Sequence, residues 1–270
     1  MYVLRLNTIL ICIRYYVILY INWMFTFLKV VQIFAITLIY LIRSYKKDQN
    51  IILLKKRWAD EILHRLGFEV HLSGQLSTEE KLICVGNHVS FVDILVLISA
   101  NPNTIFVSKK EVSQWPIIGH GAKKIKTIFL DRNNRHSSMD VRKQIANALL
   151  NENSSPNEKR HLAIFPSGTT SLFEDVPWKP GAFNIAQSTQ IKIQPFRLTY
   201  EPLRECAYID DDHLIHTMSL ILKTSHKKIY FQWGEARFVS DPIQQSEELR
   251  RWSSFQLRTE VNPILHLVLT

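Results

Sequence analysis

The chain has 270 residues, of which 46% are hydrophobic, and carries a formal net charge of +9 with a pI near 9.4. This length and composition are sufficient to bury a substantial core in one or two domains. The cysteines are odd in number, widely spaced and without a Cys-x-x-Cys pair, which argues against a disulfide framework or a zinc site. We expect free thiols in a reducing compartment; the three residues are Cys12, Cys84 and Cys206.

The positive charge indicates an acidic partner, which is a nucleic acid, an anionic membrane surface or an acidic substrate. The basic residues stand in short groups and not in the single tract typical of nucleic-acid binding. Two of these groups, at residues 43–47 and 55–57, follow directly on a long apolar segment. Because each juxtamembrane Lys or Arg contributes about 1 kcal/mol near anionic lipid, this placement favours a membrane partner over nucleic acid.

Residues 15–42 are almost wholly apolar or aromatic, and about 20 apolar residues are enough to cross a bilayer. Lys29 divides this segment into two pieces of about 13 or 14 residues, each too short to span alone. Basic residues flank both ends, so the positive-inside tendency places both ends on the cytoplasmic side. These features predict a re-entrant or interfacial, membrane-associating helical hairpin within residues 1–47; a single span is the alternative.

Beyond residue 50, helix-like and strand-like runs alternate along the chain. The patterns predict helices at 51–66, 93–99 and 138–150, and strands at 69–72, 82–85, 104–107, 127–130, 161–165, 191–200 and 228–233. Residues 151–158 form a predicted polar loop, and Asp241-Pro242 begins a mostly helical tail. The alternation predicts an α/β domain over residues 48–270, with a mixed, largely parallel sheet flanked by helices.

The segment at residues 86–93, Gly-Asn-His-Val-Ser-Phe-Val-Asp, follows a strand-like run and sets an imidazole ahead of a carboxylate. An imidazole takes a proton from a hydroxyl when a carboxylate fixes its tautomer, and such general-base help is worth about 10²–10⁴-fold in rate. On a regular helix the two side chains would lie roughly 140° apart, so we expect His88 in a turn before a helix that opens with a Ser90-x-x-Asp93 capping box. The competing interpretation is that Asp93 only caps the Ser90 amide and His88 is an ordinary turn histidine.

Four short blocks stand in order over about residues 80 to 200. They are Asn87-His88 through Asp93, then Phe129-Leu130-Asp131-Arg132, then Phe165-Pro166-Ser167-Gly168-Thr169 with Lys179-Pro180-Gly181 downstream, and finally Ile193-Gln194-Pro195-Phe196. In this order and spacing they resemble the Asn-His-x-x-x-x-Asp, Phe-x-x-Arg, Phe-Pro-Glu-Gly-Thr and proline-strand blocks of the glycerolipid acyltransferase family. Bacterial 1-acylglycerol-3-phosphate acyltransferase is the familiar type of that family.

The resemblance implies a membrane-bound O-acyltransferase at the cytoplasmic face of a bacterial inner membrane, with no cofactor and no metal. It would move a fatty acyl chain from acyl-CoA or acyl-carrier protein to the hydroxyl of a lysolipid, with 1-acyl-sn-glycerol 3-phosphate as leading acceptor and phosphatidic acid as product. His88 would deprotonate the hydroxyl while Asp93 orients the ring. Arg132 would hold a phosphate through its guanidinium fork, and amides around Gly168 would stabilise the oxyanion. The other expected substrate-binding residues are Phe129, Ser167, Thr169 and Lys179.

Ser167 departs from the family pattern, which carries glutamate at this position. One hydroxyl cannot replace the interactions of a carboxylate with cationic groups. The alternatives are therefore a different acceptor, such as lyso-ornithine lipid or another lysolipid, or a weakly active or non-catalytic lipid-binding relative. A hydrolase with Ser167 or Ser171 as nucleophile is disfavoured, because the chain lacks the Gly-x-Ser-x-Gly elbow there. Acyl-chain length and oligomeric state do not follow from the sequence.

Overall fold

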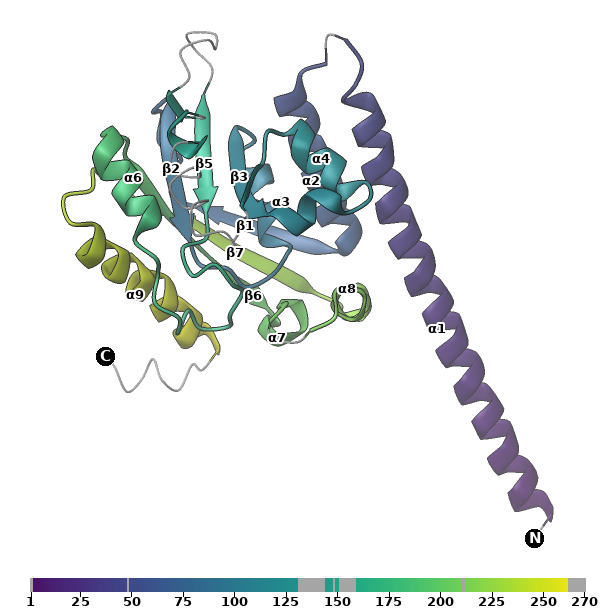
Figure 1. Cartoon of the computed structure of the whole chain (residues 1–270). Helices are drawn as coiled ribbons and strands as arrows, with labels where there is room; N and C mark the ends of the chain where they lie inside the picture. The colour runs from purple at the N-terminus through teal and green to yellow at the C-terminus, as the bar shows by residue number, and fades with distance from the viewer. Residues whose placement is uncertain are drawn as a thin grey trace.

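The computed structural model describes residues 2–47, 49–130, 144–147, 149–150, 159–209 and 212–261. Within these ranges the chain forms one sheet of seven strands in the order β1-β7-β6-β2-β5-β3-β4 (Figure 1). All neighbouring strands are parallel except β6 and β7, which confirms the prediction of a mixed, largely parallel sheet. The strands are β1 (Phe68–Ser73), β2 (Lys81–Gly86), β3 (Thr104–Lys109), β4 (Ile128–Leu130), β5 (Arg160–Ile164), β6 (Ile193–Glu201) and β7 (Lys227–Trp233).

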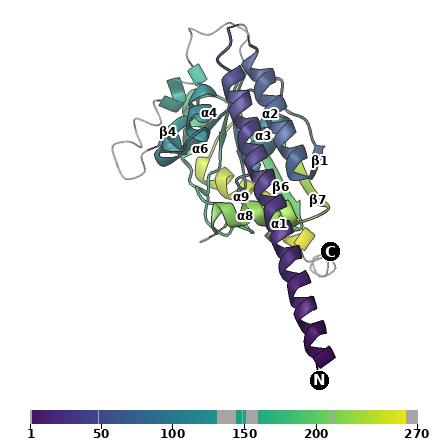
Figure 2. The same cartoon turned by 90° about the vertical axis from the view of Figure 1, so that its right-hand side faces the viewer.

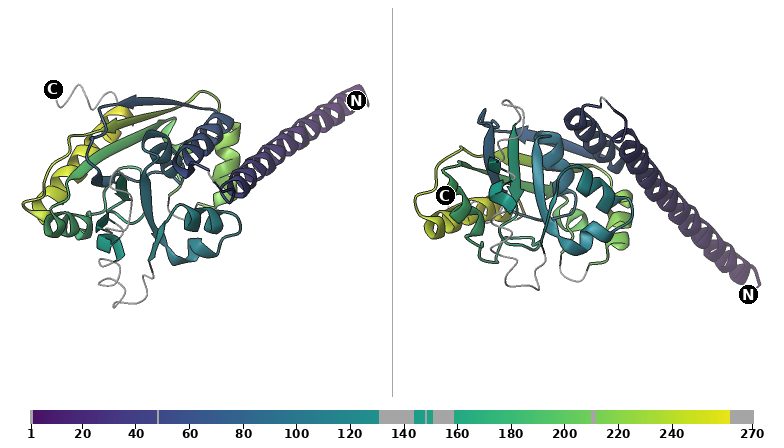
Figure 3. Two further views of the ribbon diagram at one scale, coloured as in Figure 1. Left: turned by 90° about the horizontal axis from the view of Figure 1, so that it is seen from above. Right: turned by 45° about the horizontal axis from the view of Figure 1, so that its top comes forward.

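Helices cover both faces of this sheet. In Figure 1, α6 (Gly181–Thr189) and α9 (Pro242–Val261) lie on one side, and α2 (Ile51–Leu66), α3 (Asp93–Ala100) and α4 (Ile118–Lys124) lie on the other. Figure 3, seen from above, shows the same division into helix, sheet and helix. The shorter elements are η1 (Lys110–Gln114), α7 (Leu203–Cys206) and α8 (Leu214–Lys223), and residues 144–147 and 149–150 are also helical.

Strand β2 lies in the middle of the sheet, and its side chains divide between two hydrophobic cores. Leu82 and Cys84 pack with α2 and α3, whereas Ile83 and Val85 pack with α6 and α9. This alternation follows from the two-residue period of a strand that is covered on both faces. Cys84 is a free, buried thiol, as expected, and burial raises its pKa to about 12.

The N-terminal apolar segment forms one continuous helix, α1 (Tyr2–Arg43), and does not turn back at Lys29. The predicted hairpin within residues 15–42 is therefore corrected: the hairpin is formed by the end of α1 with α2, which lie side by side (Figures 1 and 2). A helix passes Lys29 without a break because one lysine costs little helical propensity. The stretch Trp23–Arg43 is long and apolar enough to cross a membrane, and only 6% of its most apolar window is buried.

Most predicted elements after residue 50 are confirmed, with ends shifted by one or two residues. Helix α2 occupies its predicted range, since Asn50 accepts a hydrogen bond from the Leu53 amide at its start and Gly67 ends it in the left-handed region. Helices α4, α6, α7 and α8 were not predicted. Each has ten residues or fewer, so the apolar period of a helix repeats too few times to be recognised. The predicted loop 151–158 and residues 138–143 lie outside the described residues.

Gly86 ends β2 at a point where the neighbouring strand leaves no space for a side chain. A Cβ atom at this position would lie 2.4 Å from the Phe196 ring and 2.4 Å from the Phe196 carbonyl oxygen. Phe196 is fully buried on β6, so its ring cannot move away without repacking the core. Glycine therefore allows β2 and β6 to approach each other directly below the segment that carries His88.

We predict that Gly86→Ala lowers the free energy of unfolding of the full chain by about 1–3 kcal/mol, because it overpacks this contact. Denaturant titration in detergent micelles measures the change. Gly121→Ala is the matched control, since a Cβ atom there meets nothing within 4 Å. Equal stability of the two variants would contradict the close approach of the strands.

Candidate active site

The family-like blocks gather at one edge of the sheet. Strands β2, β5, β3 and β4 run in the same direction, so the segments that follow their carboxyl ends emerge together. His88 follows β2 and Phe165 follows β5, while Phe129 lies in β4 itself. Asn87 continues the pairing of β2 with β6: its side chain donates to the Leu198 carbonyl at 2.8 Å and accepts from the Leu198 amide at 2.9 Å.

His88 and Asp93 are in direct contact, as predicted. The distance from His88 Nδ1 to Asp93 Oδ2 is 2.7 Å, and the His88 side chain is 17% exposed whereas Asp93 is fully buried. His88 lies in the turn before α3, and Asp93 is the first residue of that helix. An ionised carboxylate only accepts hydrogen bonds, so Nδ1 carries the proton and Nε2 is left as the proton acceptor. The pair therefore has the arrangement of a general base and its orienting group.

The bond from the Ser90 amide to Asp93 that the competing interpretation expects is also present, at the same oxygen, but the predicted capping box is not formed, since α3 starts after Val92, which makes no side-chain cap hydrogen bond. Asp93 Oδ2 accepts from the Val89 amide at 2.7 Å and from the Ser90 amide at 3.0 Å, in addition to His88. These backbone donors stabilise the ionised carboxylate and fix the turn that holds the imidazole. The same oxygen of Asp93 therefore both holds the turn and orients the imidazole.

Tyr200 is a member of the site that the sequence did not reveal. Its hydroxyl, on β6, donates a short hydrogen bond to Asp93 Oδ1, the carboxylate oxygen that does not contact His88. Burial, together with the Asp93 carboxylate, holds the pKa of Tyr200 well above its usual range, so the phenol stays protonated as a donor. Position 200 had no signal of its own in the sequence, because an aromatic residue at the end of a predicted strand is typical of a core.

Phe165, from the third block, packs face to face on the His88 ring. The ring centroids are 3.9 Å apart with an interplanar angle of 15°. Phe165 is in turn supported edge-on by Phe196, at a centroid distance of 5.9 Å. The imidazole is thus fixed by a hydrogen bond at one nitrogen and by an aromatic face, which leaves it few alternative rotamers.

The remaining third-block residues differ in their placement. Ser167 is buried, and its hydroxyl donates to the Thr169 carbonyl at 2.8 Å, so this hydroxyl stabilises its own loop. Gly168 has φ +74°, and its amide donates to the Phe165 carbonyl at 3.0 Å within a turn, so it is not available as the expected oxyanion donor. Thr169 and Lys179 are exposed, and both lie on the loop that follows β5.

Arg132, the expected phosphate clamp, lies outside the described residues. The strand that leads to it is described: Phe129 is half-buried on β4, at the end of the sheet order. Two strands separate β4 from β2, which places their axes about 14 Å apart at the usual strand spacing. Strand β4 is parallel to β3, so Phe129 and Leu130 run toward the same end of the sheet as the close of β2.

Glu174 is the second group that sequence analysis missed, and it lies behind His88. Its side chain is fully buried, with Oε1 accepting from the His88 backbone amide at 2.8 Å and Oε2 accepting from the Trp178 indole N–H at 2.7 Å. Burial raises the pKa of Glu174 to about 7, although both donors lower it. A glutamate between two predicted strands is usually solvated, so nothing in the sequence singled out Glu174.

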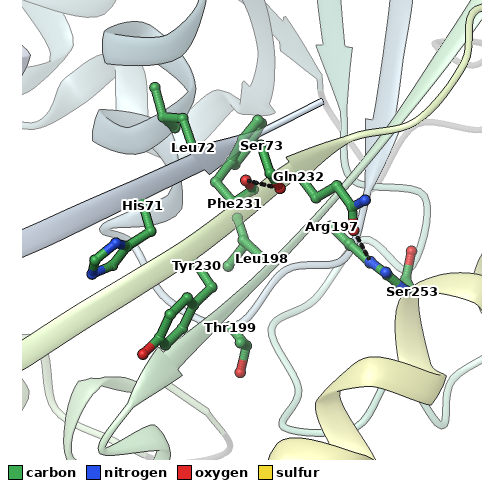
Figure 4. Close-up of a pocket in the computed structure, with 10 residues that line it drawn as sticks. All are labelled: His71, Leu72, Ser73, Arg197, Leu198, Thr199, Tyr230, Phe231, Gln232 and Ser253. Atoms are coloured by element: carbon green, nitrogen blue, oxygen red, sulfur yellow. Dashed lines mark hydrogen bonds between the residues drawn. The ribbon is translucent and has the colours of Figure 1, made fainter. Parts of the chain in front are cut away.

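Among the described residues, one groove adjoins the site and a smaller cavity lies on the other face of the sheet. A groove of about 620 Å³ is bordered by Tyr200, Leu172 and Phe173. A smaller cavity of about 150 Å³ lies on the opposite side of β6, where His71, Tyr230 and Thr199 line up across three strands (Figure 4). Among the described residues, no three His, Cys, Asp or Glu side chains gather as metal ligands.

Comparison with known proteins agrees with this geometry. A family model described as Acyltransferase matches residues 67–199. The lyso-ornithine lipid O-acyltransferase of Pseudomonas aeruginosa is 30% identical over 184 residues, which cover 66% of this chain and 67% of that protein. The 1-acyl-sn-glycerol-3-phosphate acyltransferase of Helicobacter pylori is 33% identical over 135 residues, covering 49% of this chain and 54% of that protein.

The fold has a solved counterpart. The crystal structure of the 1-acyl-sn-glycerophosphate acyltransferase from Thermotoga maritima superposes with a TM-score of 0.66 at 15% identity, covering 89% of this chain and 98% of that one. The chain described here belongs to the glycerolipid acyltransferase family and is an acyltransferase.

We predict that Tyr200→Phe lowers kcat for acyl transfer by about 10-fold or more with little change in KM, because a hydrogen bond to a buried charge contributes about 1.5–3 kcal/mol. Initial rates measure the effect. Tyr230→Phe is the matched control, since its hydroxyl donates to Glu201 on the exposed side of the sheet. Equal kcat values for both variants would show that Asp93 does not need the phenol.

Proposed function

We propose that this enzyme transfers a fatty acyl chain from an acyl thioester to the free hydroxyl of a lysolipid at a membrane surface. The observation that carries this proposal is the His88–Asp93 pair, held at 2.7 Å at the carboxyl edge of the sheet. Family membership supports the reaction class, and the long apolar α1 supports the membrane location. The cytoplasmic face is the side that the flanking basic residues favour.

In the proposed reaction, His88 Nε2 takes the proton of the lysolipid hydroxyl while the hydroxyl oxygen attacks the thioester carbonyl carbon. The tetrahedral oxyanion collapses, the carbon–sulfur bond breaks, and the imidazolium returns the proton to the leaving thiolate. Asp93 stays ionised throughout and stabilises the imidazolium. The products are an ester and a free thiol, and no covalent intermediate on the enzyme is required. The donor is acyl-CoA or acyl-carrier protein, both of which are acidic and suit a basic surface.

The leading acceptor is 1-acyl-sn-glycerol 3-phosphate, with Arg132 as phosphate clamp. A lyso-ornithine lipid is the second candidate, because relatives from Pseudomonas aeruginosa and Brucella abortus carry that name and match about two thirds or more of their length. The ornithine headgroup carries an amine and a carboxylate but no phosphate. Ser167, whose hydroxyl is held within its loop, leaves position 167 without the charge that the family pattern has there.

We predict that His88→Ala lowers turnover by at least about 10²-fold for every acceptor that the wild type uses, because the general base is lost. The assay follows radiolabelled acyl chains from thioester to a panel of lysolipids, with the purified full chain in liposomes. His71→Ala is the control, because this histidine stacks on Tyr230 at the opposite face of the sheet. Equal product from wild type and His88→Ala would end the proposal, and no product from either would favour a non-catalytic lipid-binding role.

We predict that Arg132→Ala raises KM for the phosphate acceptor by about 10-fold or more and leaves a lyso-ornithine acceptor nearly unchanged, because a bidentate contact to phosphate is lost. The measured quantity is the ratio of kcat/KM for the two acceptors. Arg132→Lys keeps the charge without the planar fork and should give an intermediate ratio. An unchanged ratio in Arg132→Ala would contradict the clamp.

A further inference from the structure

Glu174 and its loop pair with both main-chain polar groups of His88. The His88 amide donates to the Glu174 carboxylate at 2.8 Å, and the His88 carbonyl accepts from the Ser171 amide at 2.8 Å. The loop is closed on itself by the Glu174 amide, which donates to Ser171 Oγ at 3.1 Å. The amide and carbonyl of residue 88 are thus both hydrogen-bonded to this loop, as they would be to a neighbouring strand, although residue 88 lies beyond the end of β2.

The Glu174 loop is also tied to the opposite side of the molecule. Arg250 on α9 donates to the Glu174 carbonyl at 2.7 Å, and Trp178 holds the second carboxylate oxygen. Glu174 itself has φ +47°, a left-handed conformation that is uncommon for a residue other than glycine. Such conformations persist where surrounding contacts over-determine them, and they cluster at functional sites.

We propose that Glu174 is a positioning residue for acyl transfer, which fixes the His88 backbone and, when ionised, stabilises the imidazolium that forms beside it. This inference rests on the proposed role of His88 as general base. The chain has serine where its family carries a third-block glutamate, and it places a buried carboxylate seven residues further along the same loop. That carboxylate contacts the base residue itself.

The ionisation state of Glu174 falls within the working pH range of an enzyme. Its pKa of about 7 results from burial and from the neighbouring Asp93 charge, against the hydrogen bonds from Trp178 and His88. The charged groups around it are His88 and Asp93 from the segment after β2, Asp175 beside it in the chain, and Arg250 from α9, which also pairs with Glu247. Below about pH 7 most of the Glu174 carboxyl is protonated, so one of its oxygens carries a hydrogen that faces an N–H donor. The amide of glutamine has the same effect, and for this reason Glu174→Gln mimics the protonated acid.

The experiment measures kcat of the wild type divided by kcat of Glu174→Gln at a series of pH values. Ionisations of the substrates are common to both proteins and cancel in the ratio, so the pH dependence that remains comes from Glu174 and from its charge acting on the His88 imidazole. We expect the ratio to be near 1 at about pH 5.5 and to rise to about 10 at about pH 8.5, with its midpoint near 7 and little change in KM. Asp175→Asn, which changes an exposed neighbouring carboxylate, should give a ratio near 1 at every pH.

A second variant distinguishes positioning from general damage to the fold. Trp178→Phe removes a donor to the ionised carboxylate. The ratio of kcat for Trp178→Phe to kcat for the double variant Trp178→Phe/Glu174→Gln should therefore have its midpoint at a higher pH than the ratio of wild type to Glu174→Gln. A ratio of 1 throughout for Glu174→Gln, or a reduced ratio that does not depend on pH, would overturn the inference. If the Glu174 inference is overturned while His88→Ala is inactive under the same conditions, the proposed function still stands. If His88→Ala is fully active, the proposed function itself is wrong.

Discussion

The hydrogen bond between His88 Nδ1 and Asp93 Oδ2 is the interaction on which the rest of the site depends. A fully buried carboxylate stays ionised only where donors replace the water that it has lost. Asp93 receives backbone donors from Val89 and Ser90 and the phenol of Tyr200, and these leave the imidazole as its remaining partner. The carboxylate is thereby fixed in direction before any substrate binds, which is the preorganisation that general-base catalysis requires.

Strand β6 does more for this site than its place in the sequence suggests. It pairs with Asn87 through Leu198, supports Phe165 through Phe196, and supplies the Tyr200 hydroxyl to Asp93. The three contacts come from alternate residues of one strand: the Phe196 and Tyr200 side chains point to the same face of the sheet, and Leu198 contributes its main chain. The close contact of β6 with Gly86 brings that face within reach of the catalytic turn. A shift of β6 by one residue would turn the Phe196 and Tyr200 side chains away from the site.

The loop after β5 combines two kinds of group around His88. Phe165 covers the ring, while Ser171 and Glu174 pair with its backbone. Ser167, at the family's glutamate position, has its hydroxyl committed to Thr169 within the same loop. A second carboxyl group next to His88 comes from position 174, and the loop is anchored to α9 through Arg250. The proposed acyl transfer would depend on that packing as well as on the His88–Asp93 pair.

The sequence by itself determined the α/β class, the ranges of α2 and most strands, and the pairing of His88 with Asp93. These depend on local periodicity, capping residues and a spacing of five residues, all of which act over short stretches of chain. Tyr200 and Glu174 lie 107 and 86 residues from their partners, and the sheet order alone brought them together. The continuity of α1 past Lys29 follows from local helical propensity, whereas the packing of α1 against α2 was likewise decided by tertiary structure. Long-range contacts of this kind leave no local pattern, because an aromatic strand residue and a loop carboxylate have the same composition whether or not they face a catalytic histidine.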